Sequence, residues 1–128
     1  MNIKRYSKDE EALLFDLLLD EGEEWSDYHS LEGRDKYIKA IESSIVYIAI
    51  EDEMICGYIR CRDDDGFGIY IYDLLARESY RGREIGKLLM ERLCIDFPNQ
   101  LIYVMSDIDL YYEKLGFQRE GSIFRVIV

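Results

Sequence analysis

The ten residues Arg81–Met90, RGREIGKLLM, join a basic, glycine-containing turn to the start of an amphipathic helix. Gly82 permits a left-handed or closely approached backbone, and the free amides at a helix start lie at the positive end of the helix dipole. Arg81, Arg83 and Lys87 add positive charge. The stretch therefore predicts an anion site with phosphate as its natural ligand, although an ordinary strand-to-helix turn with solvated arginines has the same composition.

Glu84 puts a carboxylate in the middle of this basic turn. We expect it in the first turn of the helix, where the dipole favours a negative charge, with its side chain in solvent beside Arg81 or Lys87. The carboxylate should then weaken anion binding without abolishing it.

The chain on either side of the turn predicts a mixed α/β fold. The strand patterns cover residues 1–6, 44–51, 54–62, 68–76 and 101–105, with a final pair of strands over 117–128. The helical patterns cover residues 10–20, 34–43, 84–97 and 106–116. This order predicts one mixed central sheet, with an antiparallel meander followed by a strand–helix–strand crossover, flanked by about four helices.

Composition limits the size of the domain and the class of partner. With 128 residues, 48 % of them hydrophobic, the chain is expected to form a single domain over residues 1–128. The 27 acidic and 16 basic residues give a net charge of −11, which disfavours nucleic acid. The acidity favours a cationic partner, or it serves solubility alone.

The sequence is also informative about location. No uninterrupted apolar run approaches the roughly 18 residues of a membrane span, and the N-terminal residues lack the apolar segment of a leader. The odd number of cysteines, Cys56, Cys61 and Cys94, contains no CxxC pair and suits a reducing compartment. We therefore expect a cytoplasmic protein without a membrane partner, in which all three cysteines are buried thiols.

The spacing of Cys56 and Cys61 bears on metal binding. The two residues are five positions apart in one strand pattern, so they should face opposite sides of the sheet and cannot share a metal ion. We predict no metal site.

A second motif follows the predicted crossover, YYEKLGF over Tyr111–Phe117. Gly116 is placed to end a helix, and one of the two tyrosines should face the same end of the sheet as the basic turn. A phenol there could give up a proton. Alternatively, both tyrosines only pack the helix against the sheet.

Together the two motifs, about 30 residues apart, resemble the GNAT superfamily of N-acetyltransferases, and the predicted element order is similar to that fold from first strand to last. The family's pyrophosphate loop follows Gln/Arg-x-x-Gly-x-Gly/Ala, which Arg81 and Gly86 match, whereas Glu84 replaces the inner glycine. The resemblance implies a GNAT fold, acetyl-CoA as the cosubstrate and direct transfer of the acetyl group to an amine.

The resemblance also assigns site residues. Tyr112 takes the place of the family's general acid, which protonates the departing CoA thiolate. An asparagine often found after the preceding strand is absent, with Met105, Ser106 and Asp107 in that neighbourhood. The residues implied in cofactor binding are Leu74, Leu75, Ala76, Arg81, Gly82, Arg83, Glu84, Ile85, Gly86 and Lys87.

Acetyl transfer also needs a neutral amine, and hence a base. Asp73, directly before the segment implied to hold the pantetheine arm, is the leading candidate; His29, the only histidine, is its rival, and a surface role is the alternative for each. The acidic stretch DEGEEWSD, residues 20–27, is predicted to be a loop between the first two helices.

That loop lies where the family lines its acceptor side. Glu24, Trp25 and Tyr28 are expected to bind a cationic acceptor through charge and cation–π contact, although a solvated loop with Trp25 packed inward fits equally. The prediction is an N-acetyltransferase for a small-molecule or peptide amine, as a monomer or homodimer. The alternatives are a non-catalytic acyl-CoA-binding module and a GNAT enzyme with another acyl-CoA donor.

Overall fold

The computed structural model describes residues 1–128 and is built on a five-stranded sheet in the order β1-β2-β3-β4-β5. Antiparallel pairing joins β1 to β4 in sequence, whereas β5 runs parallel to β4. The strands are β1 (Asn2–Arg5), β2 (Ile45–Glu51), β3 (Met54–Asp63), β4 (Ile69–Ala76) and β5 (Ile102–Val104). The predicted meander and crossover are both confirmed.

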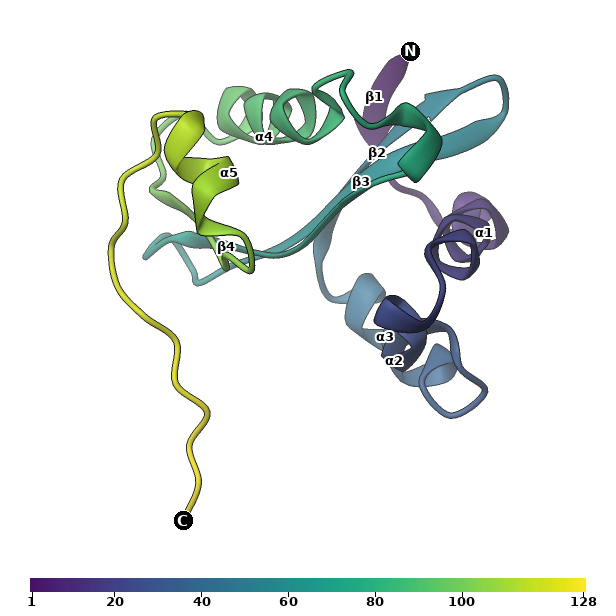
Figure 1. The fold of residues 1–128 in the computed structure, drawn as a ribbon, viewed down its shortest axis with the longest axis horizontal. Coiled ribbons are helices and arrows are strands. Elements are labelled where there is room, and N and C mark those ends of the chain that lie inside the picture. The colour runs from purple at the N-terminus through teal and green to yellow at the C-terminus, as the bar shows by residue number, and fades with distance from the viewer.

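Helices cover both faces of the sheet (Figure 1). One face carries α1 (Glu11–Glu21), α2 (Ser26–His29) and α3 (Arg34–Glu42), and the other carries α4 (Ile85–Asp96) and α5 (Asp109–Lys114). Three single 3-10 turns complete the set, η1 (Lys8–Glu10), η2 (Glu23–Trp25) and η3 (Glu78–Tyr80). The acidic stretch predicted as a loop is therefore partly helical. No helix is long and apolar enough to cross a membrane.

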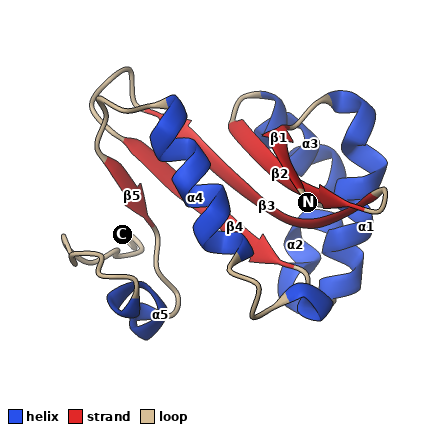
Figure 2. Ribbon diagram, turned by 90° about the horizontal axis from the view of Figure 1, so that it is seen from above, coloured by secondary structure: helices blue, strands red, loops and turns tan.

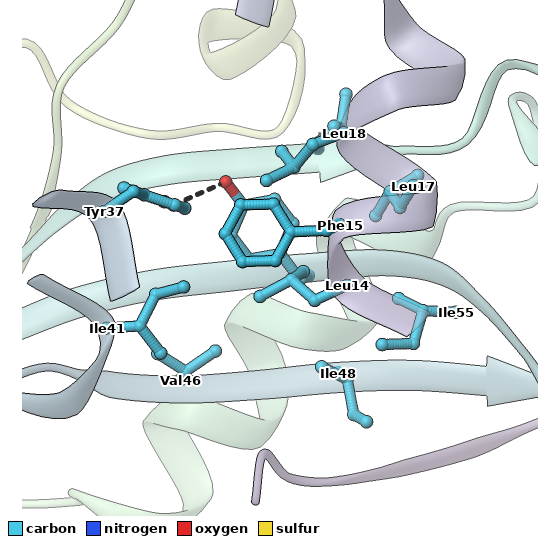
Figure 3. Packing of buried hydrophobic residues seen from close by; sticks show 11 residues of the cluster. Leu14, Phe15, Leu17, Leu18, Tyr37, Ile41, Val46, Ile48 and Ile55 are labelled. Carbon is cyan, nitrogen blue, oxygen red and sulfur yellow. Dashed lines mark hydrogen bonds between the residues drawn. The ribbon is translucent and has the colours of Figure 1, made fainter. Parts of the chain in front are cut away.

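Each face of the sheet buries its own hydrophobic cluster. The first lies under α1 and α3 and is built on Leu14, Leu17 and Leu18, which the predicted helix places on one stripe (Figure 3). The second lies under α4, where Leu89 and Leu93 pack on β3 and β4. Burial of these apolar side chains fixes α1 and α4 on opposite faces of the sheet, and both helices contact β3.

The pairing of β4 with β5 is short, and it leaves part of the β4 edge without a partner strand. Only Ile69–Ile71 of β4 pairs, with Ile102–Val104 of β5. From Asp73 to Ala76, β4 is paired with β3 alone, and Tyr72 is paired with neither neighbour. The two strands diverge beyond that point (Figure 2). The second half of β4 therefore presents an open backbone edge, with free N–H and C=O groups that an extended ligand could use.

The prediction of a final pair of strands over residues 117–128 is wrong. The structure assigns no strand after β5, and no backbone–backbone hydrogen bond involves residues 118–128. The apolar side chains of this segment, including Phe124 and Val126, are exposed. An alternating pattern indicates which side chains could share a face, but a strand also needs a partner edge for its backbone groups.

The cysteine predictions hold only in part. Cys56 and Cys61 are buried, but Cys94 is exposed. The prediction that Cys56 and Cys61 face opposite sides is also wrong, because both belong to the cluster under α4. The register shift opposite Ala49/Ile50 leaves Cys56 without a partner on β2, and this extra residue breaks the simple alternation of β3 between the two cysteines.

Candidate active site

A cleft of about 610 Å³ opens where the free edge of β4, the start of α4 and α5 meet. Its volume lies within the usual range of small-molecule sites. Every residue predicted to bind the cofactor lines it except Arg83. The segment Leu74–Ala76 and the turn before α4 therefore contribute to one cavity, although they are separated in sequence.

The turn before α4 offers a run of unsatisfied donors. The first α4 hydrogen bond runs from the Leu88 amide to the Glu84 carbonyl at 3.0 Å, and no backbone hydrogen bond has its donor between Gly82 and Lys87. Six consecutive amides are thus free at the positive end of a twelve-residue helix. Such an array is a ready-made site for an anion such as a pyrophosphate.

Glu84 holds a different position from the one we expected. The helix begins at Ile85, and Glu84 is its N-cap residue in the left-handed conformation, with φ 58° and ψ 30°. Its side chain makes no capping hydrogen bond. Glycine adopts this conformation without strain, which gives a physical reason for the glycine that the family pattern places here. The glutamate at position 84, in place of the family's glycine, therefore affects both the backbone conformation of the turn and its charge.

We predict that Glu84→Gly stabilises the protein by about 1 kcal/mol in the absence of ligand, because glycine removes the Cβ penalty of the left-handed region. The same change removes a carboxylate from the anion turn, so acetyl-CoA should bind more tightly. Chemical denaturation and calorimetric titration measure the two effects, and Glu84→Gln serves as the charge-only control. Loss of binding in the glycine variant would mean that the carboxylate has a positive role.

The basic side chains of the turn are matched by carboxylates. Arg81 pairs with Glu21 at the end of α1, at 2.5 Å, and both residues line the cleft. Arg83 points elsewhere, to Glu51 at 3.0 Å in the β2–β3 hairpin. Since these exposed pairs contribute little to stability, an incoming anion can displace them at small cost. The free amides, rather than the guanidinium groups, are therefore the donors that an anion would find fixed at this turn.

Both tyrosines of the YYEKLGF motif line the cleft. A Cβ placed on Gly86 would lie 2.9 Å from the Tyr111 hydroxyl oxygen, so the missing side chain of Gly86 makes room for Tyr111. Tyr112 packs edge-on against Tyr111 and stacks on Phe117. Burial, followed by the charge of Asp107 and the neighbouring phenol, raises the pKa of Tyr112 to about 12. Its phenol is therefore protonated at neutral pH and can serve as a proton donor.

Asp73 lies outside the cleft, inside a buried hydrogen-bond network. Its carboxylate, only 4 % exposed, accepts bonds from the Tyr28 hydroxyl at 2.7 Å and the Tyr37 hydroxyl at 2.6 Å. Arg60, also buried, completes the set through an ion pair. The hydroxyls of Tyr58 and Tyr37 also form a hydrogen bond with each other, at 2.7 Å. These contacts occupy the carboxylate with donors from α2, α3 and β3.

The part of the cleft predicted to face the acceptor is acidic and aromatic. Glu24 and Trp25, both predicted to bind the acceptor, line it together with Glu21 and Asp107. Tyr28 does not line it, and His29 is bonded through Nε2 to the Gly22 carbonyl at 2.8 Å. No group of three or more His, Cys, Asp or Glu side chains is arranged to hold a metal ion.

Several lining residues were missed at the level of sequence. They are Tyr80, Asp107, Ile108 and Leu115, whereas Glu21 belongs to the acidic stretch that was predicted to line the acceptor side. Asp107 lies directly after the strand whose end the family uses for cofactor contacts, which was an available signal. Glu21 belongs to the final turn of α1, and only the packing of that helix end against the basic turn brings it to the cleft.

A mixed sheet that splays beside a turn of free amides defines an α/β protein with a cleft for an elongated, anionic ligand. The family description "Acetyltransferase (GNAT) domain" matches residues 42–119. Because this match covers more than half of the chain, the protein belongs to the GNAT acetyltransferase family.

Solved structures with this fold extend over the whole chain. An aminoglycoside acetyltransferase from an uncultured soil metagenomic sample is 26 % identical, with a TM-score of 0.77 over 99 % of this chain and 97 % of its own. A GNAT family acetyltransferase from Streptococcus pneumoniae is 21 % identical, with a TM-score of 0.73 over 98 % and 97 %. The second likeness concerns the fold alone.

Among curated proteins, the soybean histone acetyltransferase TAP1 is 29 % identical over 75 residues, which are 55 % of this chain and 32 % of that protein. The chloroplastic GCN5-related N-acetyltransferase 2 of Arabidopsis thaliana is 28 % identical over 75 residues, 55 % of this chain and 29 % of its own length. The chain spans about a third of the length of these curated relatives.

Proposed function

We propose that residues 1–128 form an N-acetyltransferase domain that moves an acetyl group from acetyl-CoA to a primary amine on a cationic small molecule or peptide. The observation that carries the proposal is the meeting of three features in one cleft. They are the free amides of Gly82–Lys87, the open edge of β4 and a half-buried phenol, Tyr112.

In the proposed complex, the amides of Gly82–Lys87 hold the pyrophosphate of acetyl-CoA. The pantetheine arm adds to the open edge of β4 along Leu74–Ala76, where its amide groups replace the missing strand partner. Backbone groups do most of this binding, so the departure at Glu84 and the pairing of Arg83 with Glu51 are tolerated.

The amine nitrogen then attacks the thioester carbonyl carbon. As the tetrahedral intermediate collapses, the carbon–sulfur bond breaks, and Tyr112 gives its proton to the departing thiolate. The acylated nitrogen loses its extra proton to water, and the Tyr112 phenolate takes a proton back from water. The ammonium form of the acceptor has no lone pair, so it must first lose a proton. Glu24 and Asp107 line the cleft and can accept that proton through water.

The charge of the cleft supports a cationic acceptor. Glu21, Glu24 and Asp107 line it beside Trp25, and a focused negative field with an aromatic face attracts ammonium groups. Two relatives are named for an aminoglycoside and for a histone. We therefore propose both small-molecule amines and peptide amines as acceptors for this chain.

A thiol-release screen tests the proposal. With acetyl-CoA present, spermidine, an aminoglycoside and a lysine peptide should each release more free thiol than an amine of similar size that carries a carboxylate. Propionyl-CoA and succinyl-CoA in place of acetyl-CoA test the choice of donor. Binding of acetyl-CoA without thiol release for any amine would favour a non-catalytic acyl-CoA-binding module.

A further inference from the structure

We call Glu24 and Trp25, which line the cleft on the side predicted to face the amine, the acceptor wall. We propose that Tyr28 is a positioning residue whose hydrogen bond to Asp73 fixes the position of the acceptor wall relative to β4. The inference rests on the proposed function, since it concerns how the acceptor side of that cleft is built. It gives the buried network around Asp73 a part in acceptor binding.

The acceptor wall is held by partial packing. Neither η2 nor α2, which together span Glu23–His29, contains a fully buried residue, although Trp25 and Tyr28 pack against the cluster under α1 and α3. The segment begins at Gly22, whose carbonyl accepts bonds from the Trp25 amide and the His29 ring, both within the segment itself. A surface segment of this kind needs specific contacts to keep one position against the sheet.

Those contacts run through Tyr28. Its hydroxyl donates to the Asp73 carboxylate at 2.7 Å, and its ring stacks on Tyr37 with centroids 4.0 Å apart. Trp25 packs edge-on against the Tyr28 ring at 5.7 Å and against Tyr58 at 6.2 Å. Trp25, a residue of the cleft, is thus held by residues that lie behind it.

The other end of the connection is fixed. Asp73 is buried on β4, directly before Leu74, which lines the cleft. Its bonds to Arg60 and Tyr37 hold the carboxylate in place whether or not Tyr28 is bonded. The path Trp25–Tyr28–Asp73 therefore links the acceptor wall to the strand on which the thioester is proposed to lie.

Tyr37 provides a matched comparison. It donates to the same carboxylate, at 2.6 Å, but it belongs to α3, which has buried residues of its own. Removing the Tyr37 hydroxyl disturbs the network without releasing the wall. Removing the Tyr28 hydroxyl breaks the hydrogen bond between the wall and β4 and leaves the rest of the network intact.

The test compares Tyr28→Phe with Tyr37→Phe, since each keeps its ring and loses one hydroxyl. With spermidine as the acceptor, Tyr28→Phe should raise KM for the amine about tenfold, the effect of one hydrogen bond to a charged group. Its kcat and its Kd for acetyl-CoA should stay near the parent values. Tyr37→Phe should lower the melting temperature but leave KM for spermidine unchanged.

A second readout is independent of activity. Trp25 is the only tryptophan of the chain, so intrinsic fluorescence reports on the acceptor wall directly. Acrylamide should quench the fluorescence of Trp25 more strongly in Tyr28→Phe than in the parent protein. In Tyr37→Phe the quenching should equal that of the parent.

The outcomes separate the two proposals. Equal quenching in Tyr28→Phe and the parent would overturn the positioning role, as would greater quenching without any change in KM for the amine. If the parent acetylated no amine at all, the proposed function would fail, and the quenching comparison alone would decide whether Tyr28 holds the wall.

Discussion

Replacing Tyr112 with phenylalanine is expected to lower kcat for acetyl transfer about a hundredfold, the lower end of the contribution of general acid catalysis. The variant keeps the ring that packs against Tyr111 and Phe117, so the fold and acetyl-CoA binding should be retained. Only the proton for the departing thiolate is lost. Steady-state kinetics by thiol release, with calorimetry for binding, measures the two quantities.

Tyr111→Phe is the matched control, because Tyr111 lines the same cleft on the same helix. Its hydroxyl lies at the turn before α4, where a Cβ on Gly86 would meet it at 2.9 Å. The control should change kcat by much less than Tyr112→Phe does. If Tyr112→Phe kept the parent kcat, Tyr112 would not be the general acid. If Tyr111→Phe lost more kcat than Tyr112→Phe, Tyr111 would be the general acid.

The dependence of rate on pH follows from the same group. The pKa of Tyr112 is raised from the ordinary value near 10 to about 12, so its phenol stays protonated, and able to act as an acid, to higher pH. The rate should therefore rise with pH as the acceptor loses its proton. It should not fall near pH 10 as it would with an unperturbed tyrosine.

The second large effect is on stability. Asp73→Ala should lower the free energy of unfolding by about 3–5 kcal/mol, because it leaves the buried guanidinium of Arg60 without its partner. The Tyr28 and Tyr37 hydroxyls lose their acceptor as well. Urea denaturation gives the difference in the free energy of unfolding.

Asp16→Ala is the control for Asp73→Ala. It also removes a carboxylate from a buried arginine, Arg77, but Arg77 keeps its bonds to Asp20 and to the Ile55 carbonyl. That loss should be less than about 1 kcal/mol, as for an exposed ion pair. If Asp73→Ala were folded and as stable as the parent but inactive, Asp73 would act as the base and not as an anchor.

The sequence predicted the sheet and the anion turn because both depend on local patterns. The β-branched runs of β2, β3 and β4 and the glycine-containing turn before α4 are visible without tertiary information. The placement of Leu74–Ala76 beside the turn followed from the family resemblance, and the cleft lined by both segments agrees with it.

What the sequence missed depends on register and on long-range contacts. The bulge at Cys56, opposite Ala49/Ile50, puts Cys56 on the face of Cys61, and no periodicity marks such a shift. The left-handed backbone of Glu84 is set by the turn, against the preference of the residue. The network around Asp73 joins α2, α3 and β4 across 45 positions of sequence, which only the fold reveals.

The central claim is that this cleft transfers an acetyl group to a cationic amine. The most direct measurement is the mass of spermidine after incubation with the protein and acetyl-CoA, alongside the amount of free thiol. We predict acetylated spermidine in a one-to-one ratio with thiol, and neither product without the protein. Thiol released without acetylated amine, or acetyl-CoA bound with neither product for any cationic acceptor, would contradict the account.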